Sequence, residues 1–321
     1  MKQQTLKKLI SSEVAILLVL LLLCVVVSII TPSFATPTNI LNLLQRTAST
    51  GVVAIGMTFV IATSGIDLSV GGQVTLIGIL AAYAFESGMS IPVVVLMIFA
   101  LGIALGAFNG LFIAKLKFPA FMVTLSLQLI TYGFSLYLTT GRSILINCEG
   151  YDFWGLGRVA GIPVPIIIFI VVTVLGLVIM KKFTIGRKIL AVGSNEKGAW
   201  YAGINVVKTT FIAYIIAGIT ASITAIILSS KLMSATPTLG DNLELDAIAA
   251  VVIGGTSLSG GSGFIIGTVA GSLIIEVITN WMTLESIDPF LRDVVKGAII
   301  LLALLIDNIR RGKLTKNDFA G

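Results

Sequence analysis

The chain has 321 residues, of which 56% are hydrophobic and only 11% charged, and its mean hydropathy is +1.06. A soluble domain carries about 25% charged residues, so this composition excludes a soluble globular protein and indicates a membrane protein. The formal net charge of +6 does not indicate nucleic-acid binding, because the basic residues follow membrane topology instead. Without histidine, and with two cysteines that lack metal-ligand spacing, no metal site and no cofactor are expected.

The first apolar run covers residues 14–30 and is long enough, at about 25 Å as a helix, to cross a thin or locally adjusted bilayer. Three lysines precede it, and residues 33–35 resemble a cleavage site, which together suggest a signal peptide. The run is longer than the apolar core of a typical signal peptide, and the rest of the chain is equally apolar. We therefore expect an uncleaved first span.

The apolar runs predict an all-α polytopic membrane protein with about ten transmembrane helices, two of them bordering Gly-rich breaks. The eighth run is too short to span alone, and is either a half-helix or extends back over residues 239–245. The expected spans are residues 14–30, 44–63, 69–85, 91–114, 120–139, 163–180, 209–229, 246–256, 264–282 and 290–306.

The basic residues indicate the orientation. An even number of spans places both termini on one side, together with the loops after spans four and six. Fifteen of the 21 Lys and Arg residues then lie on that side, which the positive-inside rule assigns to the cytoplasm. The expected organisation is a cytoplasmic tail of residues 1–13, one membrane domain of residues 14–307 with a cytoplasmic loop of residues 181–208, and a cytoplasmic tail of residues 308–321.

The first Gly-rich break contains Gly65, Asp67, Ser69 and Gly71. The oxygen of Asp67 or Ser69 could cap the third span, or Asp67 could line a cavity, since an ionised Asp in a membrane segment is costly. In the next span Asn109 most simply forms a hydrogen bond between helices.

The second break follows a short apolar helix that begins after Glu244. Irregular backbone inside a membrane survives only where it is buried in protein or lines a water-filled cavity, so both breaks predict a translocation path. The residues of this break are Gly254, Gly255, Ser257, Gly260 and Gly261.

Glu276 lies in the middle of an expected span, one helical turn from Asn280 and on the same face. A buried Glu faces a partner or a wet cavity, and carboxylates and amides are the groups that bind sugar hydroxyls. Two interpretations stay open: Glu276 lines a substrate path with Asn280 and Asn109, or it pairs with Lys296 of the last span.

These motifs resemble the ribose-permease-like, monosaccharide branch of the ABC-importer permeases, over residues 39–307. The resemblance rests on residues 65–72, 106–110, 118–125 and 244–263, and on the loop of residues 181–208. The chain differs from the family pattern at Ala120, at Gly198 to Tyr201 and at Glu276.

The resemblance implies that residues of the loop form a coupling helix that docks on an ATPase subunit. Without it, Trp200 and Tyr201 would more simply place an amphipathic helix at the membrane surface. The expected docking residues are Gly186, Arg187, Gly193, Asn195, Glu196, Ala199, Trp200, Tyr201 and Gly203.

The resemblance also implies the function: a permease subunit of an ABC importer that moves a ribose-like pentose, hexose or related polyol across the bacterial cytoplasmic membrane by alternating access. Its partners would be ABC ATPase subunits, an extracytoplasmic sugar-binding protein, a second permease subunit and the lipid bilayer, with no nucleic acid. The alternative is an ion-coupled secondary transporter of a small polar solute, with Asp67 or Glu276 as proton site. No phosphate-binding loop and no catalytic set is present, so the sequence predicts no catalytic residue.

Overall fold

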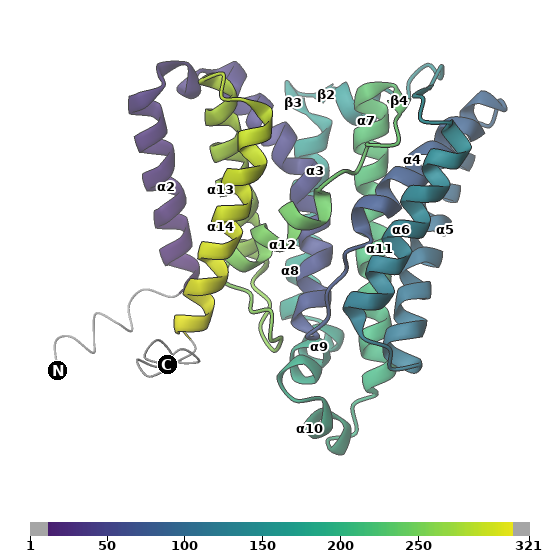
Figure 1. Cartoon of the computed structure of the whole chain (residues 1–321), viewed down its shortest axis with the longest axis vertical. Coiled ribbons are helices and arrows are strands. Elements are labelled where there is room, and N and C mark those ends of the chain that lie inside the picture. Colours follow the sequence, from purple (N-terminus) through teal and green to yellow (C-terminus); the bar gives the residue numbers. More distant parts are fainter. Residues whose placement is uncertain (1–11, 311–321) are drawn as a thin grey trace.

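The structure is a computed structural model that describes residues 12–310. Long helices lie side by side in a bundle, so the architecture is helical, as the composition predicts (Figure 1). The predicted tails, residues 1–13 and 308–321, fall largely outside the described range. Cys24 and Cys148 are both free thiols.

The long helices follow the apolar runs of the sequence. Their bounds are α2 Ser12–Ile30, α3 Pro37–Ala62, α4 Val70–Glu86, α5 Ile91–Gly110, α6 Ala120–Thr139, α8 Val164–Lys181, α11 Val206–Leu232, α12 Leu243–Ile253, α13 Ile265–Leu284 and α14 Pro289–Arg310. A π-helical turn, η2 Leu111–Lys115, extends α5, and a 3-10 turn, η1 Pro32–Ala35, follows α2.

One boundary differs clearly from the expected spans: α3 begins at Pro37 and not near residue 44. Thr36 caps it by accepting a hydrogen bond from the backbone N–H of Asn39, and Pro37 occupies a first-turn position that needs no N–H. The helix therefore begins about two turns before the expected span.

Within the described residues, six helices are long and apolar enough to cross a membrane: α3, α5 with its η2 extension, α6, α8, α11 and α13. The helices α2 and α4 are apolar but shorter by the same measure. The chain is therefore a multi-pass membrane protein.

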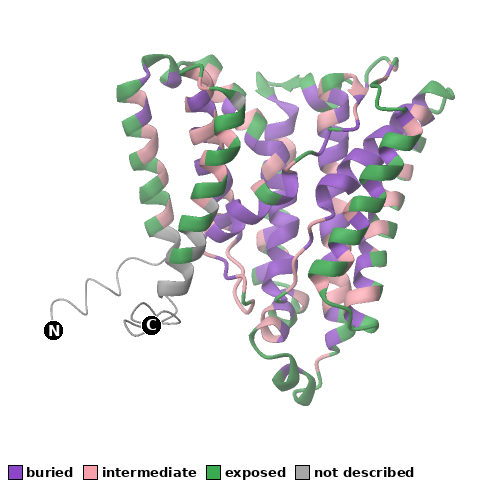
Figure 2. Cartoon of the chain, in the orientation of Figure 1, coloured by how far each residue is buried: buried purple, intermediate pink, exposed green. Residues whose placement is uncertain are grey.

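The helices α3, α4, α11 and α12 form the centre of the bundle. They pack against one another, and α4 is buried along nearly its whole length. Figure 2 shows this buried centre between more exposed outer helices, among them α2, α5 and α6. The exposed side chains of these outer helices are largely Leu, Ile, Val and Phe, which suits contact with lipid chains.

Small residues bring the backbones of α5 and α11 into contact. A Cβ atom on Gly102 would meet the carbonyl oxygen of Gly218, and one on Gly218 would meet that of Gly102. The Ser222 hydroxyl donates across this contact to the carbonyl of Ile98 at 2.9 Å. Close approach over small residues with an interhelical hydrogen bond is the usual way in which helices associate inside a membrane.

The two ends of the bundle carry different structures (Figure 1). At one, called the α10 end, the chain forms α9 Thr184–Ser194 and α10 Glu196–Tyr201. At the opposite end, called the α7 end, lie the short helix α7 Phe153–Leu156 and two antiparallel strand pairs, β1 Ile144–Leu145 with β4 Ser234–Ala235 and β2 Arg158–Val159 with β3 Ile162–Pro163.

Candidate functional site

The loop between α8 and α11 folds into the helices α9 and α10. Asn195 caps α10, because its Oδ1 atom accepts the backbone N–H of Gly198 at 2.8 Å. Glu196 lies in the first turn, where a negative charge stabilises the helix dipole. Ala199 packs with apolar residues of α9 and α11. The short helix is thus held by a cap and by a small apolar cluster.

The outer face of α10 carries two exposed aromatic side chains. Trp200 is 65% and Tyr201 80% exposed, and their ring centroids lie 5.0 Å apart in an edge-on arrangement. A groove of about 680 Å³ lies beside them, lined by Lys117, Glu196, Lys197, Trp200, Tyr201, Gly203, Ile204, Asn205, Val206 and Val207. An exposed aromatic pair beside a groove is a surface that a partner protein can bind.

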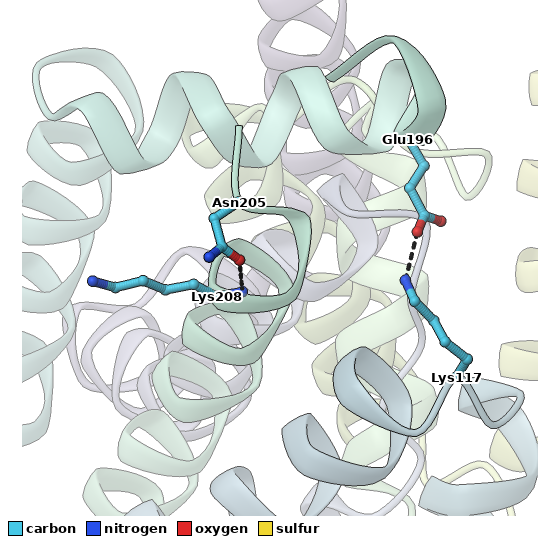
Figure 3. A network of polar contacts seen from close by, with 4 residues as sticks. All are labelled: Lys117, Glu196, Asn205 and Lys208. Atoms are coloured by element: carbon cyan, nitrogen blue, oxygen red, sulfur yellow. Dashed lines mark hydrogen bonds and ion pairs between the residues drawn. The ribbon is translucent and has the colours of Figure 1, made fainter. Parts of the chain in front are cut away.

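An ion pair joins α10 to the segment between α5 and α6. The Lys117 ammonium lies 2.6 Å from Oε1 of Glu196 (Figure 3). Lys117 has a positive φ of 61°, directly after the π-helical turn that ends α5. Both side chains are more than half exposed, so the pair adds at most about 1 kcal/mol to stability and acts mainly as a positional link.

The remaining loop residues have local structural roles. Gly186 packs against the end of α8, where a Cβ atom would lie 2.6 Å from the Cα of Met180. Gly203 ends α10 with a φ of 80°, which favours glycine. The Arg187 side chain is exposed. Asn205 caps α11 by accepting the backbone N–H of Lys208 at 2.9 Å, as drawn in Figure 3.

Three segments far apart in the sequence meet near the α10 end. The Ser64 hydroxyl, just after α3, lies 3.0 Å from the carbonyl oxygen of Gly193 in α9 and 2.9 Å from that of Ser259. The backbone N–H of Gly261 donates to the carbonyl of Ala62 at 3.1 Å. We call these residues, with Gly260, the glycine junction. The sequence indicated the three segments but not that they touch.

The segment after α12 is non-helical up to α13. Gly254 ends α12 against the backbone of Gly267, and Gly255 has a φ of 87°. Hydroxyls satisfy the loop backbone: Ser257 Oγ accepts the N–H of Ser259 at 3.1 Å, and Thr256 Oγ1 that of Phe264 at 3.0 Å. Gly260 and Gly261 also have positive φ, of 79° and 75°. Glycine is favoured at such positive φ angles because it has no Cβ atom.

Asp67 lies in a fully buried polar network. Its Oδ1 atom accepts from the Ser69 hydroxyl at 2.5 Å and the Ser69 backbone N–H at 3.0 Å. The Asn109 amide lies 3.3 Å from both carboxylate oxygens and donates to Ser69 Oγ at 2.9 Å. Asn109 of α5 therefore bonds to the non-helical segment that precedes α4. Asp67 thus accepts the backbone N–H of Ser69, the residue that precedes α4, whereas the Ser69 side chain forms no cap bond of its own.

The neighbouring glycines allow the same segment to pack closely. A Cβ atom on Gly65 would lie 2.7 Å from the Tyr214 hydroxyl, and one on Gly71 would meet a carboxylate oxygen of Glu244. Glu244 is buried and accepts from the Gln128 amide at 2.9 Å. The first break is therefore tied to α12 as well as to α5.

The predicted pairing of Glu276 with Lys296 is wrong. Lys296 instead pairs with Asp246 of α12, at 2.9 Å. The helix α12 packs against both α13 and α14, and Asp246 in its first turn lies within reach of Lys296. The Oε1 atom of Glu276 is buried and has no hydrogen-bond partner.

Asn280 is engaged elsewhere. Its amide and that of Asn39 on α3 donate to each other, each at 2.9 Å. Asn109 contacts the Asp67 network between α4 and α5, so the structure does not bring the three candidate path residues into one site.

One charged residue was misplaced by the sequence reasoning. Arg46, which the expected span of residues 44–63 puts in its first turn, lies more than two turns inside α3. The Thr36–Pro37 start signal could have revealed this, because it moves the helix start away from Arg46.

Comparison with known proteins identifies the family. The model of the "Branched-chain amino acid transport system / permease component" family matches residues 39–304. The chain belongs to this permease family. A permease component is a transport protein and not an enzyme.

This permease is similar to curated sugar permeases over most of its length. It is 43% identical to the ribose import permease protein RbsC of Bacillus subtilis, covering 90% of each chain. It is 35% identical to the xylose transport system permease protein XylH of Haemophilus influenzae, over 86% of this chain and 90% of the relative. It is 36% identical to the galactofuranose transporter permease protein YtfT of Escherichia coli, over 88% and 82%. No solved structure matches the chain.

Proposed function

We propose that this chain is the permease subunit of an ABC importer that moves a monosaccharide across the bacterial cytoplasmic membrane. The observation that carries the proposal is the 43% identity to a ribose import permease over 90% of both chains. The family description names branched-chain amino acids, but the similar xylose and galactofuranose permeases favour a sugar. A pentose or hexose, or a related polyol, is the proposed cargo.

The proposed topology has about ten spans and both termini in the cytoplasm. The chain enters α2 and leaves α14 at the same end of the bundle as α9 and α10 (Figure 1). That end carries Lys181, Lys182, Arg187 and Lys188, which the positive-inside rule places in the cytoplasm. In this topology the α10 end is cytoplasmic and the α7 end faces the sugar-binding protein.

The proposed ATPase-docking element is α10 with the groove beside it. Its exposed aromatic pair has the character of interface anchors, which are often Trp and Tyr. The Lys117–Glu196 pair and the glycine junction would connect motion of α10 to α5, to α3 and to the break after α12. Alternating access would then follow from movement of the two non-helical breaks, the one after α3 and the one after α12, both of which contact the end of α9.

The test is transport by the complete complex. The permease is reconstituted in liposomes with its proposed partners, an ABC ATPase and a sugar-binding protein, and with ATP inside. ATP-dependent uptake of ribose, xylose or galactofuranose, unaffected by a protonophore, is the expected result. Uptake of isoleucine and of no sugar would refute the sugar assignment.

One observation favours an ion-coupled secondary transporter as second candidate. The Asp67 carboxylate is buried and forms no ion pair with any described residue, as a proton-carrying group would. Uptake that persists without ATP and stops when the proton gradient collapses would establish this alternative.

A further inference from the structure

Charged side chains from five helices lie in the half of the bundle nearer the α7 end. They are Arg46 of α3, Lys231 of α11, Asp246 of α12, Glu276 of α13 and Lys296 of α14. Charges inside a membrane bundle are costly and mark a partner, a wet cavity or a ligand. Hydrogen bonds and backbone contacts show that these charges form one layer.

Two hydrogen-bonded side-chain pairs connect the antiparallel helices α3 and α13. Asn39 and Asn280 bond each other near the α7 end, and the hydroxyls of Thr58 and Thr268 lie 2.8 Å apart nearer the α10 end. Arg46 of α3 and Glu276 of α13 both lie between these two pairs, nearer the Asn39–Asn280 pair.

Arg46 and Glu276 lie at neighbouring levels of the two helices. Arg46 is seven residues beyond Asn39 and Glu276 is four residues beyond Asn280, which at 1.5 Å per residue is about 10 Å and about 6 Å, a difference that the long Arg side chain can span. The helix α12 adds Asp246 to the level of Glu276. A Cβ atom on Gly271 of α13 would meet the carbonyl of Ala250 of α12, so these two residues lie side by side. About one turn from this contact toward the α7 end, α12 carries Asp246 and α13 carries Glu276.

Lys231 is held next to Arg46 by α7. The Gln45 amide donates to the carbonyl oxygen of Gly155 at 2.7 Å. A Cβ atom on Gly155 would lie 2.5 Å from the Cα of Lys231, so α7 bridges the turn that bears Arg46 and the last turn of α11. The charges of Arg46 and Lys231 both act on the Glu276 carboxylate.

The members of the layer differ in whether they are satisfied. Asp246 and Lys296 pair at 2.9 Å and neutralise each other. Neither Arg46 nor Lys231 forms an ion pair with Glu276, and the buried Oε1 atom of Glu276 accepts no hydrogen bond. Arg46 is exposed, so water can hydrate its guanidinium group. The buried Oε1 atom of Glu276 is therefore the group that lacks a partner, and as an acceptor it requires a hydrogen-bond donor.

We propose that Arg46, Lys231 and Glu276 form a sugar-binding station in the outer half of the membrane, in which hydroxyl groups of a neutral sugar bridge the carboxylate and the two cations. This inference rests on the proposed sugar import. A hydroxyl both donates and accepts, so it can donate to Glu276 Oε1 while accepting from Arg46 or Lys231.

Two other ligands suit the station less well. A phosphate or carboxylate group brings no donor for Glu276 and repels its charge. A branched-chain amino acid brings an ammonium donor, but its apolar side chain would have to lie in a layer of five charged groups. Both are treated as outcomes of the test.

The experiment measures initial uptake of labelled ribose by the reconstituted complex, with the amount of permease in the membrane as a second readout. Glu276→Gln keeps the shape of the side chain and removes its charge, and Arg46→Gln and Lys231→Gln remove the two cations. Loss of a charge-assisted hydrogen bond should lower Vmax/KM about tenfold to a hundredfold in each. The matched control Arg142→Gln removes an exposed cation of the loop after α6, and should stay within about twofold of the original protein.

The outcomes separate this inference from the function on which it rests. If the original protein imports none of the sugars, the proposed function fails. If it imports ribose and all three variants keep their Vmax/KM at normal membrane levels, the station is refuted. Competition by isoleucine or ribose 5-phosphate, but not by unlabelled xylose, would also refute a neutral-sugar site. If a Gln variant does not reach the membrane, Arg46→Lys decides, because it keeps the charge and should still lose uptake through loss of the two-pronged donor.

Discussion

The glycine junction predicts that Gly193→Ala uncouples the permease from its ATPase. A Cβ atom on Gly193 would meet the carbonyl oxygen of Ala62 and would lie 2.6 Å from the backbone nitrogen of Gly261. Both neighbours are backbone atoms, so no side-chain rotation relieves the contact. The end of α9 must move away from α3 or from the loop after α12.

The magnitude follows from two opposed effects. Alanine is favoured over glycine in a helix by up to about 1 kcal/mol. Overpacking of a close contact costs about 1–3 kcal/mol, and here the displaced Gly261 N–H also weakens its 3.1 Å bond to Ala62, worth about 1 kcal/mol. The overpacking and the weakened bond outweigh the helix preference, and we expect a net loss of about 1–3 kcal/mol.

The assay compares thermal unfolding in detergent with ATPase activity and sugar uptake of the reconstituted complex. Gly193→Ala should lower the unfolding temperature by several degrees and reduce uptake more than ATP hydrolysis. The control is Gly133→Ala in α6, where a new Cβ atom meets nothing within 4 Å and the unfolding temperature should stay or rise. If Gly193→Ala behaves like Gly133→Ala in stability and uptake, the junction does not transmit motion.

The other predictions concern the α10 surface and the buried polar pairs. Trp200→Asp should leave the membrane level normal and abolish ATP-driven uptake, because the exposed ring is the proposed docking anchor; unchanged uptake would contradict docking at α10. Lys296→Met should destabilise the protein, by less than the about 3–5 kcal/mol lost when a fully buried pair is broken, because this pair is partly exposed. Adding Asp246→Asn should restore thermal stability; a failure to restore it would show that Asp246 is not the stabilising partner of Lys296. Asn280→Leu should cost about 1–3 kcal/mol of stability by leaving the side-chain oxygen of Asn39 without its donor, with the KM for sugar unchanged; a raised KM would return Asn280 to the substrate path.

Hydropathy was sufficient to locate the helices, because burial in lipid imposes the same apolar requirement on every span. It misplaced the start of α3, because the cap at Thr36 determines where this helix begins and a hydropathy pattern does not detect a cap. It also missed α9, α7 and the short strands, whose formation depends on packing against the rest of the bundle.

The candidate site was predictable in its local parts and not in its contacts. Asn195 follows the cap rule, and Asn109 had to find a partner because amides inside a membrane do so. Which partner a charge takes depends on how the helices are arranged in space, and for that reason the sequence offered Glu276, and not Asp246, as a possible partner of Lys296. The approach of Gly193 to Gly261 could not be inferred from either segment alone.

The burial of α3 and α4 has a consequence for how the protein enters the membrane. The helix α4 is short and almost wholly enclosed, and α3 carries Gln45 and Arg46 within its length. In the folded protein both helices present little surface to the bilayer, and Arg46 opposes insertion of α3 alone, since an arginine at the centre of an isolated span costs about 2.5–3.5 kcal/mol. We therefore expect both to wait at the insertion machinery until α11, more than a hundred residues later in synthesis, arrives to enclose them. Truncated chains that end before α11 should leave α3 incompletely integrated, whereas the strongly apolar α5 should be retained in the same fragments.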